Sequence, residues 1–133
     1  MDISHIILIF FATIFLHIYD DFKSQGILAS MKQKEWWESQ SGYNLKYEYD
    51  YTIALLAHSF SWAAAISIPS LVYYYIINKE ICLPLLFFII TQTMVHCIID
   101  DLKANERKIN LIQDQLAHII QIIIEIIILI SLI

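Results

Sequence analysis

Four long apolar stretches dominate this chain and restrict what it can fold into. They cover residues 3–22, 51–77, 81–101 and 109–133. A helix needs about 20 apolar residues to cross the hydrocarbon core of a bilayer. A helix also satisfies its own backbone hydrogen bonds in lipid. The sequence therefore predicts an all-α polytopic membrane protein, in which four transmembrane helices pack as a bundle in a single domain, residues 1–133.

The composition agrees with a membrane protein and argues against several other classes. Hydrophobic residues make up 59% of the 133 residues, whereas soluble domains usually contain about 45–50%. The net charge of −5 argues against nucleic acid, which selects basic surfaces. The first apolar stretch lacks a preceding basic region and a small-residue cleavage site, so we expect it to remain as a helix.

The basic residues indicate how the bundle is oriented. Loops between membrane helices that are rich in Lys and Arg tend to be cytoplasmic. The middle loop carries only Lys79, whereas the first and third loops carry seven basic residues, namely Lys23, Lys32, Lys34, Lys46, Lys103, Arg107 and Lys108. We therefore expect an integral protein of the bacterial inner membrane, with the first and third loops in the cytoplasm and both termini outside.

Seven ionisable residues in the apolar stretches are expected to lie together at the cytoplasmic end. Ionisable groups inside membrane helices are costly and tend to mark functional sites. His5 falls at the opposite end of the bundle. Glu125 lies deeper in the fourth helix, either as a proton or ion relay or as a partner of Ser or Tyr side chains. The seven residues are His17, Asp21, His58, His96, Asp100, Asp114 and His118.

Six of the seven form His/Asp pairs spaced by four residues, which places both members on one helix face. One such pair is explained as well by an Asp that orients a His or caps a helix. Three pairs and His58 at one depth favour a metal site, because imidazole and carboxylate suit zinc, manganese or iron. Seven ligands exceed the needs of one tetrahedral ion, so we expect one or two divalent ions, with zinc as the first choice. The spacing selects Asp21 and Asp100 and leaves Asp20 and Asp101 as interface charges.

A metal site near the cytoplasmic headgroups predicts hydrolysis of a lipid or of a membrane-delivered phosphate or ester. A bound metal ion can polarise a phosphoryl or acyl oxygen and activate water. The candidate catalytic residues are carboxylates of the site, namely Asp21, Asp100 and Asp114. The candidate substrate-binding residues are polar side chains that flank it, namely Gln25, Lys103, Arg107 and Gln115.

Two other functions stay open from the sequence. One is a non-catalytic protein that handles ions or protons, with Glu125 continuing a polar path through the bundle. The other is a metal-stabilised scaffold that recruits a partner through the first loop. The outer half of the chain carries few polar residues besides Glu125 and His5. This distribution favours the enzyme.

The first loop, residues 22–50, is rich in aromatic residues, among them Trp36, Trp37 and Tyr43. Tyrosine and tryptophan favour the headgroup region of a bilayer. We therefore expect residues 26–38 to form a short interfacial helix. It would serve either as a membrane anchor or as a lid over the site.

Two short patterns recur along the chain. Residues 20–23 read Asp-Asp-Phe-Lys and residues 100–103 read Asp-Asp-Leu-Lys, while Leu-Ala-His occurs at 56–58 and again at 116–118. Two helical hairpins related by a pseudo-two-fold axis along the membrane normal would explain this order. Chance would explain matches this short equally well.

The pattern resembles domain of unknown function 3307, a family of small bacterial and phage membrane proteins. A looser similarity extends to predicted membrane-bound metal-dependent hydrolases. The family implies no settled activity, but these polar positions are its signature, from which this chain departs in its Asp doublets. The resemblance rests on His17-Ile-Tyr-Asp-Asp21-Phe-Lys-Ser-Gln25, Leu56-Ala-His58, His96-Cys-Ile-Ile-Asp100-Asp-Leu-Lys103 and Gln113-Asp-Gln-Leu-Ala-His118. The expected partners are the lipid bilayer, a lipid-like or phosphorylated substrate and, as an option, a second copy of the chain in a homodimer.

Overall fold

The computed structural model describes residues 1–42 and 44–133, and in this part every regular element is a helix. Tyr43 lies outside the described residues. The predicted all-α fold with four long apolar helices is confirmed. The elements in order are α1 (Ile3–Tyr19), a π-helical turn η1 (Asp20–Ser24), α2 (Leu28–Met31), α3 (Lys34–Glu38), a 3₁₀ turn η2 (Leu45–Tyr47), α4 (Asp50–Asn78), α5 (Leu83–Ala104) and α6 (Leu111–Leu132).

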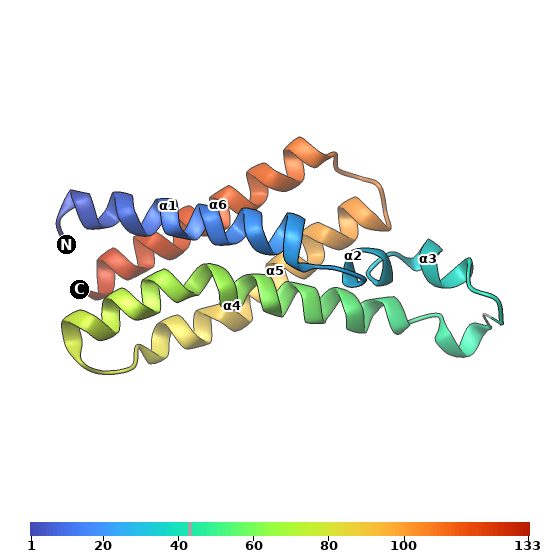
Figure 1. Ribbon diagram of the computed structural model, residues 1–133, viewed down its shortest axis with the longest axis horizontal. Coiled ribbons are helices and arrows are strands. Elements are labelled where there is room, and N and C mark those ends of the chain that lie inside the picture. The colour runs from blue at the N-terminus through green and yellow to red at the C-terminus, as the bar shows by residue number, and fades with distance from the viewer. Residues whose placement is uncertain (43) are drawn as a thin grey trace.

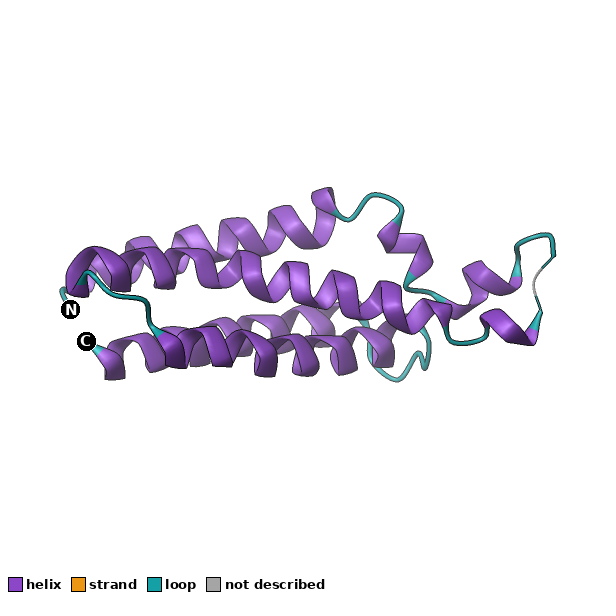
Figure 2. Cartoon of the chain, turned by 90° about the horizontal axis from the view of Figure 1, so that it is seen from below, coloured by secondary structure: helices purple, strands orange, loops and turns teal. Residues whose placement is uncertain are grey.

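The four long helices α1, α4, α5 and α6 run antiparallel to their neighbours in the chain and form one elongated bundle (Figure 1). Helix α4 packs most extensively against α5 and also contacts α1, while α6 contacts both α5 and α1. Both termini and the α4–α5 connection lie at one end of the bundle (Figures 1 and 2). The short helices α2 and α3 and the α5–α6 connection lie at the other end, which we call the loop end.

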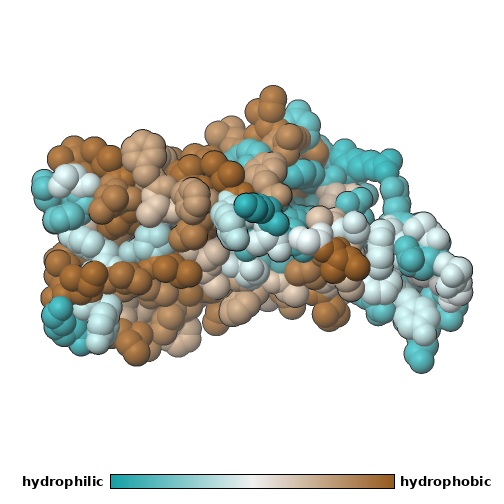
Figure 3. Space-filling model, viewed as in Figure 1, coloured by the Kyte–Doolittle hydropathy of each residue, from teal (hydrophilic) through white to brown (hydrophobic). Residues whose placement is uncertain are grey.

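The bundle presents apolar side chains outward and encloses polar ones, as a protein in lipid would. Large apolar residues such as Phe11, Phe87 and Ile112 are exposed on the helices, and Figure 3 shows apolar surface along most of the bundle, with hydrophilic surface at the loop end. Buried side chains include Thr13 and Gln92. An exposed apolar surface of this extent is unfavourable in water. The four helices are therefore candidate membrane spans by length, composition and exposure.

Local signals at the helix ends determine where the bundle turns. Lys79 adopts a left-handed conformation (φ 59°) and ends α4, donating its backbone N–H to the Tyr75 carbonyl. Helix α6 begins with a reciprocal cap, since the Asn110 side chain accepts from the Gln113 backbone N–H and the Gln113 side chain accepts from the Asn110 N–H. Such a cap satisfies two backbone donors that a helix start leaves free. It fixes the start of α6 one turn before Asp114.

The predicted interfacial helix over residues 26–38 is replaced by two shorter helices. Helix α2 ends at Met31 and α3 starts at Lys34, because Gln33 between them has an extended backbone (φ −101°, ψ 124°). We refer to residues 28–38 as the cap segment, since it lies at the loop end of the bundle (Figure 1). The break turns Lys32 toward the interior, where its side chain is almost fully buried.

Candidate metal centre

Each of the four long helices contributes one histidine to a cluster inside the bundle. Their exposed fractions are 2% or less. The His96 and His118 ring centroids are 4.2 Å apart, those of His58 and His96 are 5.1 Å apart, and those of His17 and His118 are 5.7 Å apart. The sequence prediction that these residues share one level of the bundle therefore agrees with the structure. The four are His17 of α1, His58 of α4, His96 of α5 and His118 of α6.

Three aspartates join the histidines and complete three overlapping groups of metal-ligand type. In each group, one ligand atom per residue lies within 4.8 Å of the others. All seven residues were predicted to converge, and six of them belong to these groups. The groups are Asp21–His58–His96, His96–Asp100–His118 and Asp21–Asp114–His118. The buried His and Asp side chains could therefore hold a metal ion.

The distances between ligand atoms test whether a metal ion would fit. A tetrahedral zinc site with bonds of about 2.0–2.1 Å has neighbouring ligands roughly 3.3–3.4 Å apart. His58 Nε2 lies 3.2 Å from His96 Nε2 and 3.3 Å from Asp100 Oδ2. His118 Nε2 lies 3.3 Å from Asp114 Oδ1 and 3.6 Å from Asp100 Oδ1. These spacings therefore suit a small divalent cation, either near His58 and His96 or near His118 and Asp114.

Among the buried atoms without a hydrogen-bond partner, three lie between α5 and α6 in this cluster. They are Asp100 Oδ1, Asp114 Oδ1 and His118 Nε2, and they face one another at the distances just given. His118 Nδ1 lies 3.4 Å from the Gln121 side-chain oxygen, which is only an acceptor, so in the neutral ring with its hydrogen on Nδ1 the Nε2 atom would offer a lone pair. With that tautomer, three lone pairs would converge in a buried site, and a cation bound between them would satisfy all three.

The remaining oxygens of these carboxylates are held by cationic or amide groups. Lys32 Nζ donates to Asp100 Oδ2 at 2.6 Å, and Lys103 Nζ donates to Asp114 Oδ2 at 2.5 Å. The Gln115 amide also donates to Asp114 Oδ2, at 3.0 Å. Each carboxylate is thereby held at Oδ2, which in Asp100 also lies 3.3 Å from His58 Nε2, while Oδ1 points toward His118. Outer partners of this kind orient metal ligands and are part of such sites.

The Asp21 carboxylate is held in a similar way by two glutamines. Gln115 Nε2 donates to Asp21 Oδ2 at 2.9 Å and Gln25 Nε2 donates to Asp21 Oδ1 at 2.9 Å. Gln25 also contacts the Asp21 backbone carbonyl. Asp21 Oδ1 lies 3.6 Å from His58 Nε2. Gln115 was predicted to bind substrate. In the structure its amide lies between Asp21 and Asp114 and orients both carboxylates.

His17 belongs to the histidine cluster but is absent from the three ligand groups, although it was predicted as a metal ligand. Its Nδ1 accepts from the Trp62 indole N–H at 2.8 Å, so its Nε2 carries the hydrogen and faces the Gln115 side-chain oxygen at 3.1 Å. Both ring nitrogens are therefore engaged. The four-residue spacing from Asp21 could not reveal these partners, because they come from α4 and α6.

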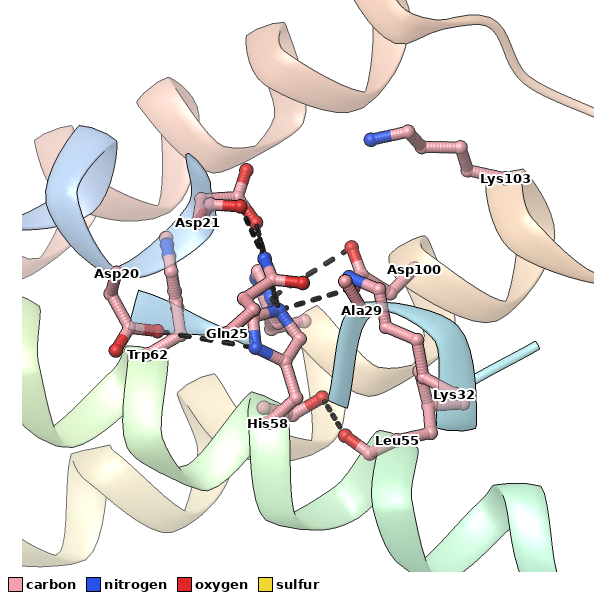
Figure 4. Close-up of polar contacts among 12 residues, drawn as sticks. Asp20, Asp21, Gln25, Ala29, Lys32, Leu55, His58, Trp62, Asp100 and Lys103 are labelled. Atoms are coloured by element: carbon pink, nitrogen blue, oxygen red, sulfur yellow. Dashed lines mark hydrogen bonds and ion pairs between the residues drawn. The ribbon is translucent and has the colours of Figure 1, made fainter. Parts of the chain in front are cut away.

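Asp20 corrects a second expectation, since it is buried instead of lying at the interface. It accepts hydrogen bonds from Ser24 and Ser61, each at 2.9 Å, and its Oδ2 lies 4.0 Å from His58 Nδ1 (Figure 4). The cause is the π-helical turn that starts at Asp20. A π turn has an extra residue compared with an α turn, so two consecutive aspartates both face inward. Asp101, by contrast, stays half-buried and accepts from Asn105.

The cap segment supplies a site residue that sequence reasoning missed. Lys32 was interpreted only as a topology signal, yet its ammonium group reaches Asp100 (Figure 4). Asn105 fixes the cap segment to the end of α5, since its side chain donates to the Lys32 carbonyl and accepts from the Lys34 N–H. The Arg107–Glu35 ion pair adds a second link. A cluster of lysines in a loop gives no indication of which one will be buried.

A pocket of about 390 Å³ lies beside the cluster at the loop end. It brings together carboxylates of the candidate metal centre, three cationic side chains and two glutamines. Three of the four predicted substrate-binding residues line it, and Gln115 does not. The lining residues are Asp21, Phe22, Gln25, Lys32, Gln33, Asp100, Lys103, Ala104 and Arg107.

No protein-family model, curated protein or solved structure matches this chain. The chemistry of the site must therefore be argued from its own residues.

Proposed function

We propose that this protein is a membrane-embedded, metal-dependent hydrolase that acts on a lipid or on a membrane-delivered phosphate or ester. One observation carries the proposal: three buried, unpartnered lone-pair atoms converge beside a pocket lined by cationic side chains. The first feature fits a divalent cation, for which zinc is the first choice and manganese or iron the alternatives. The second feature fits an anionic group of a substrate.

The residues of the chain have distinct roles in this proposal. Asp100, Asp114 and His118 would hold the cation. His58, His96 and Asp21 would supply its remaining ligands or hold a second ion. The bound ion would supply Lewis acidity that polarises a phosphoryl or acyl oxygen. Lys103 and Arg107 line the pocket and would neutralise substrate charge, and Lys32 would do so from the cap segment. A carboxylate of the cluster, Asp21, Asp100 or Asp114, would accept the proton released from water.

The placement of the pocket favours an enzyme over an ion pathway. The pocket lies at the loop end, whereas the layer beyond the cluster is closed to solvent by Trp62, Ile66 and Ile122, each 0% exposed, and by the buried pair Gln92 and Gln121. Substrate would reach the cluster from the headgroup layer and leave its apolar part among lipids. The alternative function is a non-catalytic protein that handles ions or protons. The buried Glu125, which lies beyond this layer on the side of the termini, would favour that alternative.

We further propose that the loop end is cytoplasmic and both termini are outside, in a bacterial inner membrane. The basic residues of the first and third loops lie at the loop end, opposite both termini. Reporter fusions at Ile133 and within the first loop at Lys34 are expected to show opposite sides of the membrane. A cytoplasmic signal from Ile133 would contradict this orientation.

The hydrolase is tested by incubating zinc-loaded protein with liposomes that contain membrane lipids and phosphorylated isoprenoids. Mass spectrometry is expected to show a hydrolysed product with wild type and with His5→Ala, whose side chain lies at the far end of the bundle. Asp100→Ala is expected to give only background product. Identical lipid profiles for wild type and Asp100→Ala, together with ion or proton conduction by wild type, would support the alternative function instead.

The resemblance to domain of unknown function 3307 supports the metal centre of this proposal but not a particular reaction, since the family implies no settled activity. Its quoted motifs contain all six residues of the three ligand groups, with Gln25 and Lys103 of the pocket. We propose membership of that family on these positions. The homodimer expected from the sequence stays a prediction.

A further inference from the structure

Glu125 is a second buried carboxyl group, separate from the candidate metal centre. It lies seven residues beyond His118 on α6, which is about 10 Å along the helix axis. Its side chain is 1% exposed. Ser67 of α4 donates to its Oε2 at 3.1 Å, whereas its Oε1 has no hydrogen-bond partner. The proposed hydrolysis uses no group at this depth.

The surroundings of Glu125 are polar but carry no charge. The buried polar groups on the two neighbouring helices include the hydroxyl groups of Ser67 and Ser70 on α4 and the amide of Gln92 on α5. Ser70 is fully buried and its hydroxyl also lacks a partner. Among the described residues, no ion pair links Glu125 to a Lys, Arg or His.

In the part of the chain that the structure describes, the other elements around Glu125 add no titratable partner. On α6 itself, the preceding polar residue is Gln121, whose amide donates to the Gln92 side-chain oxygen at 2.8 Å. On α1, the buried residues are Ile9, Thr13 and His17. His17 lies at the level of His118, one layer away from Glu125. The groups that face the carboxyl are therefore hydroxyls and amides.

An ionised carboxylate in this environment would be strongly unfavourable. Burial of an unpaired charge in an apolar medium costs far more than burial of a neutral acid. A carboxylic acid, in contrast, has a donor on one oxygen and an acceptor on the other. The Ser67 hydroxyl satisfies the acceptor, and the Ser70 hydroxyl, which has no other partner, is available to accept the acid hydrogen.

We propose that Glu125, Ser67 and Ser70 form an intramembrane proton-binding site in which Glu125 holds one exchangeable proton as a carboxylic acid. The unpartnered Glu125 Oε1 and Ser70 Oγ would share this proton. Gln92 and Gln121 connect the site to the candidate metal centre, since Gln121 also contacts His118. The inference concerns a different group and a different ligand from the proposed hydrolysis.

Two measurements test the proton site on the full-length protein. Dicyclohexylcarbodiimide modifies buried carboxylic acids, and peptide mass spectrometry locates the adduct. Infrared spectroscopy detects the C=O stretch of a protonated carboxyl. At pH 6, wild type is expected to carry an adduct on Glu125 and an acid C=O band, both absent from Glu125→Gln. Ser70→Ala is expected to shift the band, whereas Ser131→Ala, an exposed serine near the end of α6, is expected to leave it unchanged.

Two outcomes would overturn the proposal. The first is the absence of both the Glu125 adduct and the acid band from folded wild-type protein at pH 6. The second is suppression of both signals by sodium chloride but not by choline chloride, which would assign the site to an alkali cation. Loss of metal binding in Asp100→Ala would leave the Glu125 signals in place, so the two sites are tested independently.

Discussion

Replacing Asp100 by alanine is expected to remove bound metal almost completely. Asp100 faces His118 with one oxygen and His58 with the other, so its loss affects both sides of the cluster. Removal of an outer-shell partner typically lowers metal affinity about 10–100-fold. Removal of a carboxylate at the centre of the cluster should exceed that range. Element-resolved analysis of the purified protein, with zinc titrated against a competing chelator, measures the change.

The neighbouring aspartate provides the matched control. Asp101→Ala removes the same charge one residue along α5, but Asp101 bonds to Asn105 at the loop end and does not face the histidines. It is expected to keep the zinc content of wild type, as is His5→Ala. Asp100→Asn preserves the shape of the side chain and separates metal loss from misfolding. Equal metal content in wild type, Asp100→Ala and Asp100→Asn would exclude the metal centre.

The second large effect is expected from Trp62, the fully buried indole at the base of the cluster. Its ring stacks on His96 with centroids 4.1 Å apart, and its N–H donates to His17. Truncation of a buried Trp to Ala typically costs about 3–5 kcal/mol. Trp62→Ala is therefore expected to lower the free energy of unfolding by about this amount, as measured by reversible unfolding in mixed micelles. The metal affinity should fall as well, because His96 loses the surface that orients it.

One further variant at Trp62 separates its ring packing from its hydrogen bond, and a second variant at Trp37 serves as the control. Trp62→Phe retains an aromatic ring against His96 but removes the donor to His17, so its cost should be about that of one hydrogen bond, roughly 1 kcal/mol. Trp37→Ala removes a half-buried indole of the cap segment, which donates to the Met31 carbonyl. It should leave the bundle nearly as stable as wild type. A Trp62→Ala protein with wild-type stability would show that the packing around this indole is not as described.

Hydrophobicity and spacing were sufficient to predict the bundle and most of the cluster. The four helices follow from stretches long enough to cross a bilayer, and the basic loops place the His/Asp pairs at one end. His96 and Asp100, and likewise Asp114 and His118, lie on shared helix faces within the same group. Spacing alone was enough to place these pairs, because both residues of each pair belong to one regular α-helix.

The sequence could not reveal contacts that depend on irregular backbone or on neighbouring helices. Asp20 is buried because the chain adopts a π turn, which no four-residue pattern predicts. Lys32 reaches Asp100 across 68 positions of sequence, from a loop whose lysines are otherwise exposed or half-buried. The two ring nitrogens of His17 bond to an indole and an amide on two other helices, and His17 is absent from the three ligand groups. In each case tertiary packing decides the role of the side chain.

The inward placement of polar groups has a consequence for how such a chain can change over evolution. Lipid-facing positions require only an apolar side chain, so Ile, Leu, Val and Phe can replace one another there with little loss of stability. The interior positions are bound to partners on two or three other helices, and a change at one of them requires a matching change elsewhere. Homologous chains should therefore lose overall identity quickly while keeping a small set of His, Asp, Gln and Lys positions, and relatives would be recognised by the spacing of those positions.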